Sequence, residues 1–75
     1  MIPLQKSTFS KLVGKRVREL REEKRWTREQ LAEDSALHVN SIKSIELGEK
    51  MPSIYTVYKI AFSLNMELEN LVSEL

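Results

Sequence analysis

The sequence predicts an all-α fold, a compact bundle of five short helices in a single domain. Apolar residues recur every three or four positions through most of its 75 residues, which is the spacing of amphipathic helices. Alternation of the kind found in β-strands is brief, and no Asn-Gly or Asp-Gly hairpin turn occurs. Residues that cap or end helices separate the apolar runs, so the predicted helices are short and have defined ends.

Residues 1–8 are expected to form a flexible arm, because they contain a proline and show no periodicity. The first helix is expected at residues 9–24, with Ser7 or Ser10 as its cap. Its apolar face is formed by Phe9, Leu12, Val13, Val17 and Leu20. Glycine costs roughly 1 kcal/mol relative to alanine in an exposed helix. Gly14 therefore favours the close approach of a neighbouring helix.

Residues 28–47 have the spacing of a helix-turn-helix, two short helices joined by a tight turn. Thr27 and Gln30 have the pattern of a capping box, which fixes the start of the first helix at the next residue. Trp26 and Leu31 have the spacing of a hydrophobic staple. Glycine at position 48 and proline at position 52 stop the second helix.

The second helix of this pair, residues 39–47, has two different faces. Ile42 and Ile45 are three residues apart and are expected to point inward. The opposite face carries side chains that are short or form hydrogen bonds, namely Val39, Asn40, Lys43 and Ser44. A helix-turn-helix places this face of its second helix in a DNA major groove.

Two more helices are expected in the last third of the chain. Ser53 is expected to cap the first of them and Asn65 to end it. Its apolar set is wide enough to predict a largely buried helix: Ile54, Val57, Tyr58, Ile60, Ala61 and Leu64. Tyr55, Tyr58 and Trp26 are interpreted as packing residues, because a platform for stacking bases needs aromatic side chains along a basic groove. Residues 67–75 are expected to form the last helix.

The net charge of +1 conceals a strong asymmetry. Residues 1–28 carry nine Lys and Arg against three Glu, a balance of +6, and the other 47 residues have a balance of −5. Such a distribution is typical of a basic surface that binds phosphates. A basic helix with an ordinary solvated face is an equally weighted alternative from charge alone.

The composition also argues against several classes of protein. Cysteine is absent and His38 is the single histidine, so disulfides, zinc sites and catalytic triads are not expected. A helix cap or a phosphate contact is the preferred role for His38. No phosphate-binding glycine loop or nucleophile elbow occurs, so we expect neither an enzyme nor a cofactor or metal. No signal peptide or membrane-spanning run is found, and a cytoplasmic location is expected.

The chain resembles the Cro/C1-type helix-turn-helix family, in three pieces that keep their order and spacing: GKRVRELREEKRWTREQLAE, NSIKSIELGEKMPSIYTVYKIAFSLNM and ELENLV. The family comprises phage-repressor-like and xenobiotic-response-element-like DNA-binding domains, and the resemblance covers about residues 12–73. It implies a lambda-repressor-like fold with the helix at residues 39–47 in the major groove. The base-reading positions then fall on Val39, Asn40, Lys43 and Ser44, whose chemistry suits base edges and thymine methyls.

Further roles are implied by the same resemblance. Arg28 matches the position that touches DNA phosphate in this family. The other phosphate candidates are Thr27, His38, Ser41 and Lys50. An inward salt bridge is implied between Arg21 and Glu46.

One departure from the family lies in the turn. Glycine is usual there, whereas this chain has Ala36-Leu37-His38. A left-handed conformation at Ala36 would cost about 1–2 kcal/mol and would affect the tilt of the second helix.

The function expected from these observations is that of a stand-alone, sequence-specific regulator of transcription that binds double-stranded DNA. We expect a homodimeric repressor on a palindromic operator, associated with the nucleoid of a prokaryote or encoded by a phage or mobile element. The expected dimer interface consists of Leu64, Met66, Leu68, Leu71, Val72 and Leu75. The alternatives are a controller protein of a restriction-modification system, an autoregulating antitoxin with a toxin partner, and a protein-interaction module that has lost DNA binding.

Overall fold

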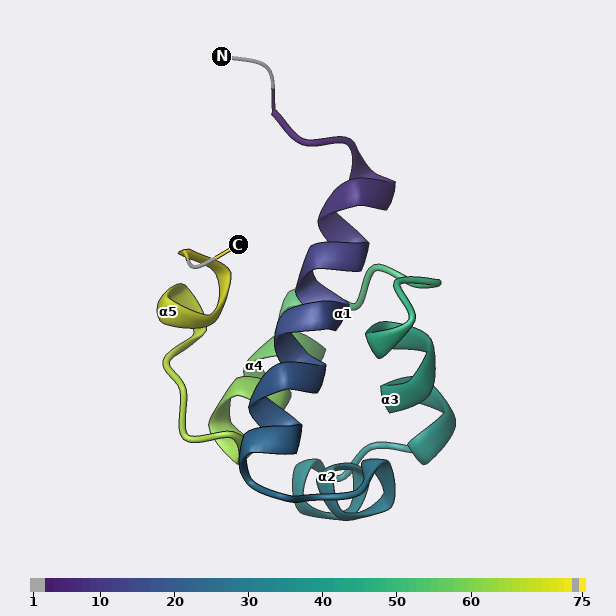
Figure 1. Cartoon of the computed structure of the whole chain (residues 1–75), viewed down its shortest axis with the longest axis vertical. Coiled ribbons are helices and arrows are strands. Elements are labelled where there is room, and N and C mark those ends of the chain that lie inside the picture. The colour runs from purple at the N-terminus through teal and green to yellow at the C-terminus, as the bar shows by residue number, and fades with distance from the viewer. Residues whose placement is uncertain (1–2, 74) are drawn as a thin grey trace.

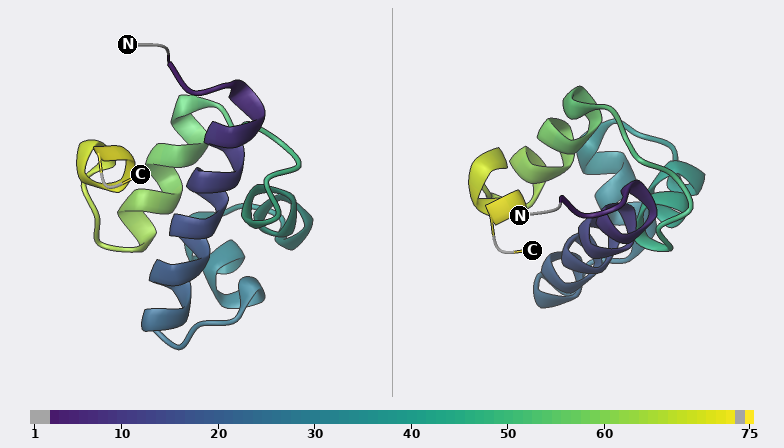
Figure 2. Two further views of the ribbon diagram at one scale, coloured as in Figure 1. Left: turned by 45° about the horizontal axis from the view of Figure 1, so that its top comes forward. Right: turned by 90° about the horizontal axis from the view of Figure 1, so that it is seen from above.

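The computed structural model describes residues 3–73 and 75 and contains five helices. They are α1 (Lys6–Glu23), α2 (Arg28–Ser35), α3 (Val39–Glu46), α4 (Ile54–Ser63) and α5 (Leu68–Ser73). No strand occurs in the described part of the chain, and the predicted all-α fold is confirmed. The long helix α1 runs through the middle of the molecule (Figure 1). Viewed from above, α3 and α5 lie on opposite sides of the pair formed by α1 and α4 (Figure 2).

A single apolar core joins all five helices. Its buried members are Val13, Val17, Leu20, Leu31, Ala32, Ile42, Ile45, Val57, Ile60, Ala61, Leu64 and Leu71. Trp26 and Leu37 are partly buried and pack against this core from the two ends of α2. Burial of these side chains stabilises helices that are too short to be stable in isolation.

Helix α1 begins earlier than the sequence predicts. Its first residue is Lys6, and the amide of Phe9 donates to the carbonyl of Gln5 at 2.9 Å. The expected start at residue 9 is therefore wrong by one turn, and an arm of eight residues is too long. Neither expected cap is used, because the residue at the N-cap is Gln5 and the Ser10 hydroxyl donates back to the carbonyl of Lys6. Residues 1 and 2 lie outside the described part of the structure.

The approach of α3 to α1 depends on Gly14. A methyl group built at this position would lie against the carbonyl oxygen of Ile45 and 2.8 Å from that of Glu46. Real Cβ atoms do not come so close to backbone atoms, so any other residue would push α3 away from α1. The predicted close approach of a helix at Gly14 is confirmed.

Each of the first four helices is followed, one or two positions after its last residue, by a residue with a positive φ angle. These residues are Arg25, Ala36, Gly48 and Asn65, with φ between 56° and 72°. Asn65 follows the last turn of α4 as predicted, with the amide of Met66 bonded to the carbonyl of Ala61. Only one of the four stops is a glycine, the residue that adopts this conformation without strain.

The expected burial of α4 and α5 is partly wrong. Ile54, Tyr55, Tyr58 and Phe62 of α4 are all exposed, so this helix is buried on one side only and the two tyrosines are not core residues. Leu64 and Leu71, expected in a dimer interface, are instead buried in the core of the chain itself. The last helix, α5, packs on α4 and has only six residues. Its expected length of nine residues is too great.

Candidate nucleic-acid interface

The first helix of the helix-turn-helix begins at the predicted capping box. The amide of Gln30 donates to Thr27 Oγ1 at 3.1 Å, and the amide of Thr27 donates to Gln30 Oε1 at 2.7 Å. These reciprocal bonds satisfy two backbone donors at the start of α2. The remaining amides of this first turn point out of the helix, where its dipole favours an anion.

The turn between α2 and α3 contains a strained residue. Ala36 has φ 56° and ψ 44°, which is the left-handed conformation. The amide of Leu37 reaches back to the carbonyl of Ala32 at 2.9 Å and closes the end of α2. Alanine thus adopts a conformation for which glycine is better suited. The strain considered from the sequence, where alanine replaces the glycine usual in this turn, is present. His38 stands at the N-cap of α3, but its side chain makes no capping bond, so that predicted role is wrong.

The buried and the exposed residues of α3 lie on different faces of the helix. Ile42 and Ile45 are buried and hold the helix against α1 and α2. Asn40 and Lys43 are exposed, whereas Val39 and Ser44 are partly buried at the edges of the same face. No hydrogen bond within the described part of the chain involves the side chain of Asn40 or Lys43, so the amide and the ammonium group remain available to a ligand.

Glu46, the last residue of α3, is held by two arginines. Its side chain has 0% exposure. Arg21 donates from Nε to Oε2 at 2.6 Å and from Nη2 to Oε1 at 3.0 Å. Arg28 donates from Nε to the same Oε1 at 3.0 Å. The predicted salt bridge between Arg21 and Glu46 is present, and a second arginine joins it.

This cluster connects three helices and carries an excess of positive charge. Arg21 comes from α1, Arg28 from the start of α2 and Glu46 from the end of α3. Arg21 Nη1 also donates to the carbonyl of Trp26 at 2.7 Å. The hydrogen bond to Glu46 raises the pKa of Arg21, against the opposing effect of burial. One carboxylate faces two guanidinium groups, so one positive charge is left over.

The link between Arg28 and Glu46 was missed by sequence reasoning. The residues are 18 positions apart, and no local pattern joins the first residue of one helix to the last residue of the next. The side chain of Arg28 keeps 29% exposure. Within the described part of the chain, only its Nε is hydrogen-bonded, and the residue lies at the start of α2 beside the open backbone amides.

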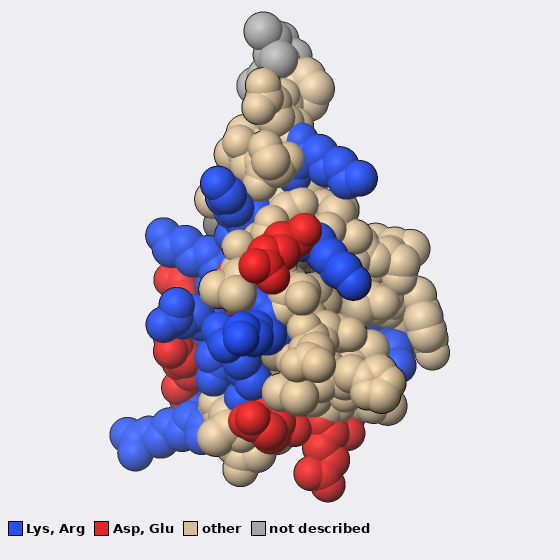
Figure 3. Space-filling view, turned by 90° about the vertical axis from the view of Figure 1, so that its right-hand side faces the viewer, with Lys and Arg blue, Asp and Glu red and all other residues tan. Residues whose placement is uncertain are grey.

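Basic side chains border the face that α3 presents. Lys11, Lys15 and Arg18 are exposed along α1. In a view onto the side of α3, Lys and Arg gather over α1 (Figure 3). Acids lie among them, near the centre and at the lower end of this face, and most of the rest is uncharged. The phosphate candidates Thr27, His38 and Lys50 are exposed and Ser41 is partly buried. They stand at the two ends of α3 and at the start of α2.

Other kinds of site find little support in the described residues. No group of three or more His, Asp or Glu side chains is arranged to hold a metal ion there. No helix in this part of the chain has the length and apolar character needed to span a membrane.

The chain belongs to the helix-turn-helix domain family, whose model matches residues 14–74. It is thus a helix-turn-helix, DNA-binding protein of the transcription-regulator class. Transcription regulators of this class are typically not enzymes. No curated protein sequence matches the chain.

Three solved structures illustrate the similarity. The restriction-modification controller protein C.AhdI from Aeromonas hydrophila has 32% identity and a TM-score of 0.80, over 83% of this chain and 94% of that one. A transcriptional regulator of the HTH_3 family from Vibrio cholerae has 21% identity and a TM-score of 0.86, over 93% of this chain but 39% of that one. The competence regulator ComR from Streptococcus vestibularis has 32% identity and a TM-score of 0.80, over 87% and 22%. The chain therefore spans less than half of the longer regulators.

Proposed function

We propose that this chain is a sequence-specific repressor that binds a palindromic operator as a homodimer, with α3 in the major groove. Such a repressor works in the cytoplasm, on the nucleoid. Val39, Asn40, Lys43 and Ser44 read the bases in this proposal. Thr27, Arg28, His38, Ser41 and Lys50 contact the flanking phosphates.

The observation that carries the proposal is the outward face of α3. Asn40 and Lys43 are exposed and three residues apart, so they share one face of the helix. An asparagine can bind adenine through two hydrogen bonds, and a lysine can donate to the O6 and N7 atoms of guanine. The buried isoleucines behind this face fix the helix on its scaffold, which lets Asn40 and Lys43 select bases.

The surroundings of α3 supply the non-specific part of the binding. The start of α2 offers open amides and Arg28, and α1 offers a row of exposed Lys and Arg. Contacts of this kind position a protein on the duplex and make its affinity dependent on salt. One short helix contacts few base pairs, so two copies on two half-sites are needed for useful specificity.

The experiment is selection of bound duplexes from a random DNA library with the wild type and with Asn40→Ala. The wild type is expected to enrich an inverted repeat with half-sites about 34 Å apart, centre to centre. Asn40→Ala is expected to lose preference at one base pair of each half-site, at a cost of about 1–3 kcal/mol. Asn70→Ala, an exposed asparagine on α5, is the matched control. Equal preferences for the wild type and Asn40→Ala would refute the assignment.

Activation is the second candidate function. The controller protein C.AhdI matches over 94% of its length at 32% identity, which favours a similar control of transcription for this chain. Transcription in vitro from a template that carries the selected site decides between the two. A repressor lowers the transcript level as protein is added, whereas an activator raises it.

A further inference from the structure

Helix α4 has a continuous apolar strip on its outer side. Ile54, Tyr55, Tyr58 and Phe62 are 70%, 65%, 50% and 72% exposed, and we call these four residues the α4 stripe. The rings touch in succession, with centroids 6.5 Å apart for Tyr55 and Tyr58 and 6.2 Å apart for Tyr58 and Phe62. The other large exposed apolar residues in the described chain, Leu4 and Leu47, are not part of it.

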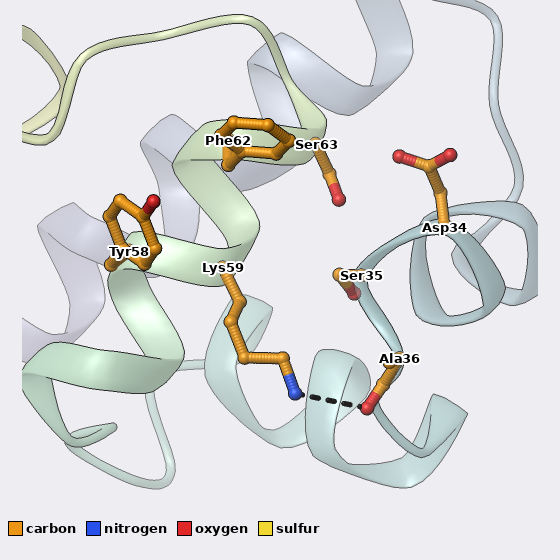
Figure 4. Close-up of a pocket in the computed structure, with 7 residues that line it drawn as sticks. All are labelled: Asp34, Ser35, Ala36, Tyr58, Lys59, Phe62 and Ser63. Carbon is orange, nitrogen blue, oxygen red and sulfur yellow. Dashed lines mark hydrogen bonds between the residues drawn. The ribbon is translucent and has the colours of Figure 1, made fainter.

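A hollow of about 290 Å³ lies beside the stripe. One wall is formed by Tyr58, Lys59 and Phe62 of α4, and the facing wall by Asp34 and Ser35 at the end of α2 (Figure 4). The same face of the molecule therefore has projecting rings and a recess next to them. Aromatic side chains in such a setting are typical of the centre of a protein interface.

The hollow is lined by one residue of each charge. Lys59 lies on one side of it and Asp34 on the other. Lys59 Nζ donates to the carbonyl of Ala36 at 3.2 Å and lies 5.5 Å from the ring of Tyr55. It forms no salt bridge with a carboxylate among the described residues. Under two-fold symmetry, a contact of Lys59 with Asp34 of the other copy would occur twice.

These features indicate that a second copy of this chain binds to the face with the α4 stripe and the hollow. An interface between identical subunits with two-fold symmetry must be complementary to itself. This face meets that requirement, because it has both the projecting rings of the α4 stripe and a hollow, and both an acid and a base. The face also leaves α3 uncovered, because α3 and α4 lie on different sides of α1 (Figure 2).

We propose that the homodimer forms through the α4 stripe, with aromatic rings of each copy entering the hollow of the other and Lys59 pairing with Asp34 across the axis. This names the subunit surface of the regulator proposed above and rests on that proposal for its role. It replaces the interface expected on the last helix. There Leu64 and Leu71 are buried, and Met66, Leu68, Val72 and Leu75 already pack against the core of their own chain.

Sedimentation equilibrium without DNA tests the interface. Phe62→Ser is expected to raise the dimer dissociation constant about 30-fold or more, the size of effect seen when a central aromatic residue is lost. Leu4→Ser, an exposed apolar residue away from the stripe, is the matched control and should leave the constant unchanged. Thermal unfolding monitored by circular dichroism should show that both variants fold, because both side chains are exposed.

Charge exchange gives a second readout. Lys59→Glu and Asp34→Lys are each expected to weaken the dimer, and the double variant is expected to restore it. A wild type that stays monomeric, a Phe62→Ser variant that dimerises normally, or a double variant that shows no rescue would overturn the proposal. Because no DNA is present, a dimer that forms as proposed but selects no duplex would refute the proposed function and leave this interface standing.

Discussion

Arg28 and Arg21 share one oxygen of Glu46: the Nε of Arg28 and the Nη2 of Arg21 both lie 3.0 Å from Oε1. This single carboxylate holds the end of α3 to the last turn of α1 and to the start of α2. The two parts of the interface that should touch DNA, the reading face of α3 and the amides of α2, are thereby fixed relative to each other.

Replacing Glu46 by glutamine should strongly destabilise the fold. The variant leaves two guanidinium groups near a neutral side chain, and breaking a buried pair of this kind costs about 3–5 kcal/mol. Chemical denaturation followed by circular dichroism measures the loss. Glu22→Gln is the matched control, because Glu22 pairs with Arg18 in the open at 3.4 Å, and exposed pairs contribute less than about 1 kcal/mol. Equal losses for the two variants would contradict the role of Glu46.

Changes at Arg28 should separate its charge from its geometry. Arg28→Gln should weaken binding to all duplexes alike and lower the slope of log K against log salt by about one. Arg28→Lys keeps the charge and should keep the slope, but it loses the planar fork that can bind Glu46 and a phosphate together. Fluorescence anisotropy at several salt concentrations gives both values. An unchanged slope in Arg28→Gln would remove this residue from the phosphate contacts.

Replacing Ala36 by glycine should stabilise the protein. Relief of the left-handed conformation is worth about 1–2 kcal/mol, and the added freedom of the unfolded chain takes back roughly 0.5–1 kcal/mol. A net gain of about 0.5–1 kcal/mol is expected in thermal or chemical unfolding. Ala32→Gly, inside α2 with ordinary helical geometry, should instead lose about 1 kcal/mol or more. A loss at position 36 as well would show that the turn is not strained.

Local signals explain the parts of the fold that the sequence predicted well. The capping box of Thr27 and Gln30 and the cap at Ser53 act over three residues and are visible in any helical segment. Gly14 was informative for a similar reason, since an unfavourable residue inside a helix needs a packing explanation. The buried isoleucines of α3 followed from spacing alone, and with them the direction of its outward face.

The errors occurred where tertiary contacts decide. The apolar residues of α4 cover more than half of its circumference, and periodicity cannot tell which of them face the core and which face solvent. Leu71 was expected in a dimer interface, yet α5 turns that residue inward against α4. The partner of Arg28 lies on another helix, so no spacing rule identifies it. The residues proposed to read bases and touch phosphates remain a prediction.

The left-handed stops at Arg25 and Ala36 are a reserve of stability that the natural sequence does not use. Both lie between helices, Arg25 in the link from α1 to α2 and Ala36 in the turn before α3, where Ala36 also lines the hollow beside the α4 stripe. Glycine at position 25 would let an engineer stabilise the scaffold against heat without changing any residue proposed for recognition or assembly.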